Sequence, residues 1–229
     1  MFAPLTPFEG QALLLSLQVG AASLLVTAPL GIALAWLLAR GRFPGKWLLE
    51  ALVNLPLVLP PVVTGLLLLL AFGAQGPVGA WMRETFGVTL AFSWLGAALA
   101  AAVMAIPLVV RPIRLSFEAV DRGLEQAAAT LGAPPWRVFA HITLPLAAPG
   151  IVAGAFLGFA RAFGEFGATV TFAGSIPGET QTLPVAIYAS LQRAEGETSA
   201  VRLAVISVAV AVGAILAAEA CNRRLHKAR

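Results

Sequence analysis

The chain has 229 residues, of which 59% are hydrophobic and only 11% are charged. Soluble domains carry roughly a quarter charged residues, so this composition excludes an ordinary soluble protein and predicts an integral membrane protein. The formal net charge of +4 would suit a nucleic-acid partner, but the basic residues stand in short clusters between apolar runs. We therefore expect the protein to lie in a lipid bilayer and to bind no nucleic acid.

Apolar runs long enough to cross a membrane recur along the chain. Four of them reach the ~20 residues that a transmembrane helix needs, and they are residues 13–39, 47–72, 88–110 and 201–220. A fifth run, 146–173, spans the bilayer only if the charges of Arg161 and Glu165 are sheltered. The pattern predicts an all-α membrane protein with about five transmembrane helices in a single domain, residues 1–229. The segment 183–191 is too short to span and leaves room for a further periplasmic or re-entrant helix.

The lysines and arginines indicate the orientation of these spans. With five spans and the N-terminus outside, the inner segments hold Arg40, Arg42, Lys46, Arg111, Arg114, Arg122, Arg137, Arg223, Arg224, Lys227 and Arg229. The outer segments hold only Arg83, Arg193 and Arg202. Cytoplasmic loops of membrane proteins carry the excess of basic residues. We therefore predict an external N-terminus, a cytoplasmic C-terminus, a cytoplasmic loop at about 111–146 and a periplasmic loop at about 175–200.

The cytoplasmic loop contains a sharp corner between two short helices. Residues 124–131 are rich in alanine and favour a helix, Gly132 suits the left-handed position after it, and a proline at 134 or 135 suits the start of the next. The second helix would carry the apolar side chains of Trp136, Val138, Phe139 and Ile142. Leu144 and Pro145 would then turn the chain back toward the membrane. Two interpretations stay open: a knob that fits a groove on a soluble partner, or a loop lying on lipid headgroups.

The same segment carries a spaced motif. It has the form Glu-Ala-Ala, three residues, Gly, nine residues, Ile, one residue and Leu-Pro, and the matching residues here are Ala127, Ala128, Gly132, Ile142, Leu144 and Pro145. Gln126 stands where the motif has glutamate, and Glu125 lies one residue earlier. On these residues the chain resembles the permease subunits of binding-protein-dependent ABC importers. In that family the segment is a coupling helix that inserts into a cleft of the ATPase subunit, which implies a coupling role for Glu125, Gln126, Arg137 and the motif residues.

Three longer stretches narrow this resemblance. Residues 40–65, 91–121 and 160–184 are similar to the molybdate ABC-transporter permeases, and the likeness covers nearly the whole chain. The sulfate and thiosulfate permeases share a GEFGA-like segment, here at 164–168, so a sulfate permease is the alternative.

The resemblance also implies a fold and partners. The fold is that of a type I ABC importer permease (MetI-like), in the bacterial inner membrane. The implied partners are a second copy of the chain, two cytoplasmic ATPase subunits and a periplasmic molybdate-binding protein. The implied function is the ATP-driven import of molybdate. Tungstate, an oxyanion of the same chemistry, is a second cargo that this resemblance allows.

The second apolar run contains features that suit a translocation path. Pro56, Pro60 and Pro61 each remove a backbone donor, and the freed carbonyls are tolerated where they are packed in protein or line a water-filled cavity. Asn54 and Thr64 flank this stretch. The alternative is a kink that only helps packing, since prolines are frequent in membrane helices.

Two charges and several small residues mark the fifth run. Glycines at 150, 154 and 158 permit close approach of another helix, in the same subunit or in a second copy. Arg161 and Glu165 are four residues apart and would share a helical face. They either line the path or form a mutually satisfied structural pair, because charges at membrane depth must pair or face water. Thr169 lies close by in the sequence and is a further candidate for the path.

The sequence offers no convincing reaction centre. His141 and His226 are the only histidines, and a phosphate-binding GxxxxGK[ST] loop is absent. We expect no metal site, no bound cofactor and no enzyme activity in this chain, with ATP and Mg²⁺ bound by the partner ATPase. Two rivals from other classes are a membrane enzyme that uses Arg161 and Glu165 on a lipid substrate, and an ion-coupled carrier. The first lacks a positioned catalytic partner, and the second would show inverted repeats.

Overall fold

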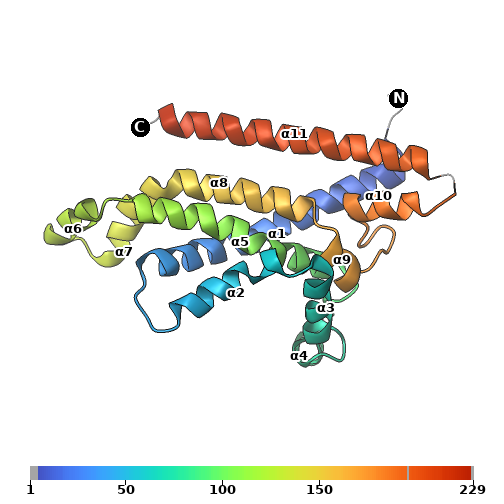
Figure 1. Ribbon diagram of the computed structural model, residues 1–229, viewed down its shortest axis with the longest axis horizontal. Helices are drawn as coiled ribbons and strands as arrows, with labels where there is room; N and C mark the ends of the chain where they lie inside the picture. Colours follow the sequence, from blue (N-terminus) through green and yellow to red (C-terminus); the bar gives the residue numbers. More distant parts are fainter. Residues whose placement is uncertain (1–4, 195, 228–229) are drawn as a thin grey trace.

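The regular secondary structure of the described residues is helical throughout (Figure 1). The computed structural model describes residues 5–194 and 196–227, and it describes the side chains of the last helix up to residue 217. The helices are α1 (Pro7–Arg40), α2 (Lys46–Val58), α3 (Pro61–Phe72), α4 (Pro77–Phe86), α5 (Trp94–Ala119), α6 (Arg122–Thr130), α7 (Pro135–Val138), the π-helix η1 (Phe139–Thr143), α8 (Leu144–Phe163), α9 (Gly167–Phe172), α10 (Leu183–Leu191) and α11 (Glu197–Lys227). The prediction of an all-α protein is confirmed.

About five spans are present, as predicted, although one of them is broken. Within the described residues, the stretches Pro7–Arg40, Trp94–Ala119, Pro135–Phe163 and Glu197–Ala217 are long and apolar enough to cross a membrane. The helices α2 and α3 qualify only as a pair, bent by 115°. The basic residues of the C-terminal tail that supported the predicted orientation lie outside the described side chains.

The core is a three-helix packing of α1, α5 and α8 (Figure 1). Small residues allow α5 and α8 to approach closely. A Cβ added to Gly154 would lie 2.8 Å from the carbonyl oxygen of Val109, and one added to Gly158 would lie 2.3 Å from Val109 Cγ2. The sequence did not decide whether these glycines face a helix of the same subunit or of a second copy. The structure shows that they contact α5 of the same subunit.

The sequence treated 47–72 as one loosened run, and the structure corrects this to two helices. Leu59 (φ −70°, ψ 138°) and Pro60 (φ −55°, ψ 134°) are both extended. Each of them precedes a proline, and the ring of the following proline disfavours the helical conformation at that position. Two successive prolines therefore break the helix, and α3 with α4 projects from the side of the bundle (Figure 1).

The predicted run 88–110 is also displaced. The helix α5 begins after Ser93, whose hydroxyl accepts a hydrogen bond from the Gly96 amide at 3.2 Å, and it continues to Ala119. Residues 111–119 of the predicted cytoplasmic loop are thus helical. The helix can extend because Arg114 pairs with Glu50 at 2.9 Å and with Glu118 at 2.7 Å, so its charge is compensated.

The helix α10 packs against α1 toward the end of the molecule away from α6 and α7, and the long helix α11 packs on α10 and α8 (Figure 1). The segment 183–191 forms the additional short helix, α10, with Leu183, Val185 and Ala186 buried. Arg202 lies on α11 rather than in a loop, and its Nε is 2.7 Å from Glu9 Oε1. This ion pair, which sequence reasoning missed, joins α11 to the start of α1.

Candidate coupling site and translocation path

The predicted corner forms through local backbone chemistry. Gly132 follows α6 with φ +86°, a conformation that L side chains rarely adopt. The Gly132 amide donates to the carbonyl of Ala129 at 3.0 Å, and the Ala133 amide donates to the carbonyl of Ala128 at 3.1 Å. These two bonds make a Schellman motif. Pro135 then begins α7, as a proline at the first helical position should.

The tip of this corner presents apolar side chains to its surroundings. The side chain of Leu131 is 89% exposed and that of Trp136 is 63% exposed. The Arg137 guanidinium lies 5.1 Å from the centre of the Trp136 ring. Ala128 and Ile142 of the motif line a shallow hollow beside them. Exposed apolar side chains gathered on a protruding corner favour a contact surface.

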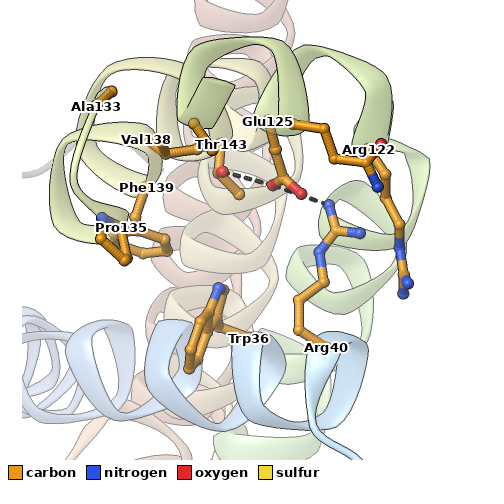
Figure 2. A pocket seen from close by; sticks show the side chains of 11 residues that line it. Trp36, Arg40, Arg122, Glu125, Ala133, Pro135, Val138, Phe139 and Thr143 are labelled. Atoms are coloured by element: carbon orange, nitrogen blue, oxygen red, sulfur yellow. Dashed lines mark hydrogen bonds and ion pairs between the residues drawn. The ribbon is translucent and has the colours of Figure 1, made fainter. Parts of the chain in front are cut away.

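Glu125 points toward Arg40 and Thr143 of its own subunit (Figure 2). Its Oε1 lies 3.1 Å from Arg40 Nη2 and accepts a hydrogen bond from Thr143 Oγ1 at 2.6 Å. Gln126 and Ala127, the next two residues, are exposed. The structure therefore separates the coupling residues into an outward set and one carboxylate that is bound internally.

A pocket of about 520 Å³ lies behind the corner (Figure 2). It is lined by Trp36, Arg40, Arg122, Glu125, Gln126, Ala129, Ala133, Pro135, Val138, Phe139 and Thr143. Trp36 meets Phe139 edge to face, with the ring centres 5.9 Å apart. Sequence reasoning missed Trp36, and it counted Arg40 only as an inner charge, because α1 lies far from the motif in sequence.

The predicted turn at 144–145 is wrong. Leu144 and Pro145 begin α8, and α7 runs through the π-helix into α8 without a break. The Leu144 amide donates to the carbonyl of Phe139 in the wider π turn. Pro145 has no amide hydrogen to donate, and the π turn directly before it is the irregularity at which the continuous helix accommodates this proline. The corner is therefore joined to a long core helix by continuous helical backbone.

The structure brings some candidate path residues together and separates others. Gly65 on α3 packs against α9, where an added Cβ would lie 2.7 Å from the carbonyl oxygen of Ala168. Thr64 and Thr169, on these two packed helices, are buried, and their hydroxyls find no hydrogen-bond partner within the described residues. Asn54 lies on the other side of the bend made by Pro60 and Pro61, on α2.

Asn54 joins α2 to α5. Its Oδ1 accepts a hydrogen bond from Arg111 Nε at 3.0 Å, and its Nδ2 donates to the carbonyl of Glu50 at 2.7 Å. Both the oxygen and the nitrogen of the amide are therefore engaged with the protein. This contact positions α2 against α5 before the chain bends at the two prolines.

Arg161 and Glu165 form an ion pair, although not on one helical face as predicted. The helix α8 ends at Phe163, so Glu165 lies in the link to α9. Its carboxylate binds Arg161 Nη1, and its Oε1 accepts a hydrogen bond from the Ala168 amide at 2.8 Å. Only 2% of Glu165 is exposed. The buried Glu165 carboxylate is thus held within this subunit by Arg161 and by an amide in the first turn of α9.

The structure is a multi-span helical bundle with one broken span and an exposed helical corner, and comparison with known proteins shows the family to which it belongs. Residues 28–227 match the family of binding-protein-dependent transport system inner membrane components, and the chain belongs to this family. The chain is therefore a multi-pass membrane permease component of an ABC importer.

The individual relatives confirm the resemblance to molybdate permeases. The chain is 56% identical over 215 residues, 94% of each chain, to the molybdenum transport system permease protein ModB of Escherichia coli strain K12. It is 42% identical over 162 residues to the sulfate transport system permease protein CysT of the same strain, covering 71% of this chain and 58% of that protein.

Solved structures support the predicted type I (MetI-like) fold. A chain of the MetNI methionine ABC transporter, in an inward-facing conformation, matches with a TM-score of 0.69 over 95% of this chain and 94% of that chain. The sequence identity is 18%, so this likeness concerns the fold alone.

Proposed function

We propose that the chain is the transmembrane subunit of an ATP-driven importer that moves molybdate, and tungstate with it, from the periplasm to the cytoplasm. The observation that carries the proposal is 56% identity across 94% of both chains to a protein named for molybdenum transport. Sulfate is the second candidate cargo, on the 42% identity to a sulfate permease over a shorter part of that protein.

The proposed assembly contains two copies of this chain, two cytoplasmic ATPase subunits and a periplasmic molybdate-binding protein. ATP and Mg²⁺ bind to the ATPases, and this chain holds no cofactor of its own. The N-terminus lies outside and the C-terminus lies in the cytoplasm, which places α6 and α7 where an ATPase can reach them. The exposed side chains of Leu131 and Trp136 support this docking role.

Transport follows alternating access in this proposal. ATP binding draws the docking clefts of the two ATPases together and carries α6 and α7 inward. Because α7 continues through the π-helix into α8, the displacement reaches the core helices and opens the path toward the periplasm. ATP hydrolysis then resets the inward-facing state.

The proposed path runs along α3 and α9, beside the bend at Pro60 and Pro61. The hydroxyls of Thr64 and Thr169 offer neutral donors for a passing oxyanion. Neutral donors suit a transporter, because a cargo must bind weakly enough to leave again. Glu165 binds Arg161, so the arginine charge does not trap the anion. Arg161, Glu165 and Asn54 shape the region around the path.

Uptake of labelled molybdate into proteoliposomes tests the proposal. The vesicles contain this subunit, its ATPase and its binding protein, with and without ATP, and unlabelled tungstate or sulfate as competitors. We expect ATP-dependent uptake that tungstate blocks and sulfate does not. Preferential block by sulfate would assign the chain to sulfate transport, and turnover of a lipid by the chain without ATPase would favour the membrane enzyme.

A further inference from the structure

The last turn of α1 makes a set of contacts behind the coupling corner (Figure 2). Arg40 ends α1, and its side chain is 13% exposed. Its Nη2 lies 3.1 Å from Glu125 Oε1 on α6 and 3.3 Å from the carbonyl oxygen of Val120, the residue directly after α5. One guanidinium nitrogen thus joins α1, the end of α5 and α6.

The carboxylate of Glu125 extends this connection to α8. Thr143, at the end of the π-helix, is 2% exposed and donates to the same Oε1 that Arg40 reaches. One turn before Arg40, Trp36 packs edge to face on Phe139 of the π-helix. A polar contact and an aromatic contact, spaced by one helical turn, therefore hold α1 against the coupling segment.

These contacts matter because α6 has little packing of its own. None of the nine residues of α6, all of which the structure describes, is buried. Apolar burial is the main source of helix orientation in a folded protein. Since α6 lacks it, the direction of α6 relative to α1 depends on the charge-assisted contact of Arg40 with Glu125.

At its other end α1 contacts the outer part of the bundle. Ser16 Oγ accepts a hydrogen bond from the Leu183 amide at the start of α10, at 2.6 Å. Glu9 binds Arg202 of α11 through two contacts, of 2.7 Å and 2.9 Å. The single helix α1 thus connects the coupling corner with α10, which lies toward the other end of the long axis, and with Arg202 near the start of α11 (Figure 1).

We propose that Arg40 is a positioning residue of the coupling apparatus, through which movement of α6 is passed to α1 and along α1 to α10 and α11. The inference rests on the proposed function of the chain as a permease subunit. It assigns the Glu125 carboxylate to a joint within its own subunit, while the exposed tip of the corner meets the ATPase.

The test compares transport with hydrolysis in the complete transporter. Arg40→Gln and Glu125→Gln are each reconstituted with the ATPase and the binding protein, and molybdate uptake is measured per ATP hydrolysed. We expect this ratio to fall roughly five- to tenfold in either variant, within the usual range of coupling between sites, while ATP hydrolysis changes less than about twofold. Arg40→Lys should restore most of the ratio, because an ammonium group still pairs with Glu125.

The matched control is Arg114→Gln. Arg114 also binds two carboxylates, those of Glu50 and Glu118, but it does not contact the corner. Its uptake per ATP should match the wild type. The double variant of Arg40→Gln and Glu125→Gln should lose no more than either single variant, since both remove one joint.

An unchanged ratio in Arg40→Gln or Glu125→Gln, or additive losses in the double variant, would overturn the role of Arg40 and leave the proposed function intact. If Arg40→Gln fails to assemble with the ATPase, Glu125→Gln decides, because it keeps the shape of the side chain. Absence of ATP-dependent uptake by the wild type would instead overturn the proposed function, and the role of Arg40 with it.

Discussion

A carboxylate lies near each end of α8, and the two are bound in contrasting ways. At the corner, Glu125 binds Arg40, which is 85 residues away in the sequence, and its side chain is 22% exposed. At the other end, Glu165 binds Arg161 and the Ala168 amide, which are its neighbours in sequence, and it is 2% exposed. The buried local pair suits a fixed structural element, whereas the more exposed long-range contact suits a joint that transmits movement.

This contrast predicts that the largest loss of stability comes from the buried pair. Arg161→Ala leaves the Glu165 carboxylate buried without its charge partner, which costs about 3–5 kcal/mol. We expect a marked fall in the thermal unfolding midpoint of the purified subunit and in its level in the membrane. Arg40→Gln should cost much less, because water reaches the Glu125 carboxylate.

A double variant separates a structural role of the pair from a role in the path. Arg161→Met with Glu165→Gln removes both charges, and the glutamine can still accept the bond from Ala168. We expect this variant to recover most of the lost stability and most of the molybdate uptake. A stable double variant without uptake would show instead that the arginine charge serves the passing anion.

The next effect should come from the backbone of the corner. Gly132→Val forces a β-branched residue to φ +86°, at a cost of at least about 1–2 kcal/mol, so the Schellman motif should open. We expect uptake per ATP to fall roughly tenfold while the subunit still inserts and assembles. Gly87→Val is the control, since Gly87 has φ +68° after α4 and equal open space. Normal transport by Gly132→Val would reject the coupling assignment of the corner.

The smallest effect should appear in the proposed path. Thr64→Val and Thr169→Val remove buried hydroxyls that have no partner in the described structure, so the unfolding free energy should stay within about 0.5 kcal/mol. Uptake should fall roughly two- to tenfold if each hydroxyl donates one hydrogen bond to the oxyanion. Thr171→Val is the control, because its hydroxyl already donates to the carbonyl of Gly167 at 2.8 Å. Unchanged uptake in both variants would remove the two threonines from the path.

Features set by local chemistry were predictable from the sequence. The corner depends on a glycine in the left-handed conformation and a proline that begins the next helix, and both were assigned correctly from residue type and spacing. The break after Val58 was foreseen as a weakness at the prolines. Its 115° bend was not, because that angle depends on the packing of α3 against α9.

Features that join distant parts of the chain were not predictable. The partners of Glu125 come from α1 and the π-helix, and the partner of Glu9 comes from α11. A single sequence carries no signal for such pairs. The pairing of Arg161 with Glu165 was predicted for the wrong reason, since the expected shared helix ends at Phe163, between the two residues.

The central claim, that the corner docks on an ATPase rather than on lipid headgroups, is tested most directly by cross-linking. The native cysteine, Cys221, is first replaced by serine, and a photoreactive group is attached to Leu131→Cys at the exposed tip in the assembled transporter. Leu191→Cys, which is also exposed but lies on α10, is the control. We predict a cross-link from position 131 to the ATPase and none from position 191; cross-links from position 131 to lipid alone would contradict the account.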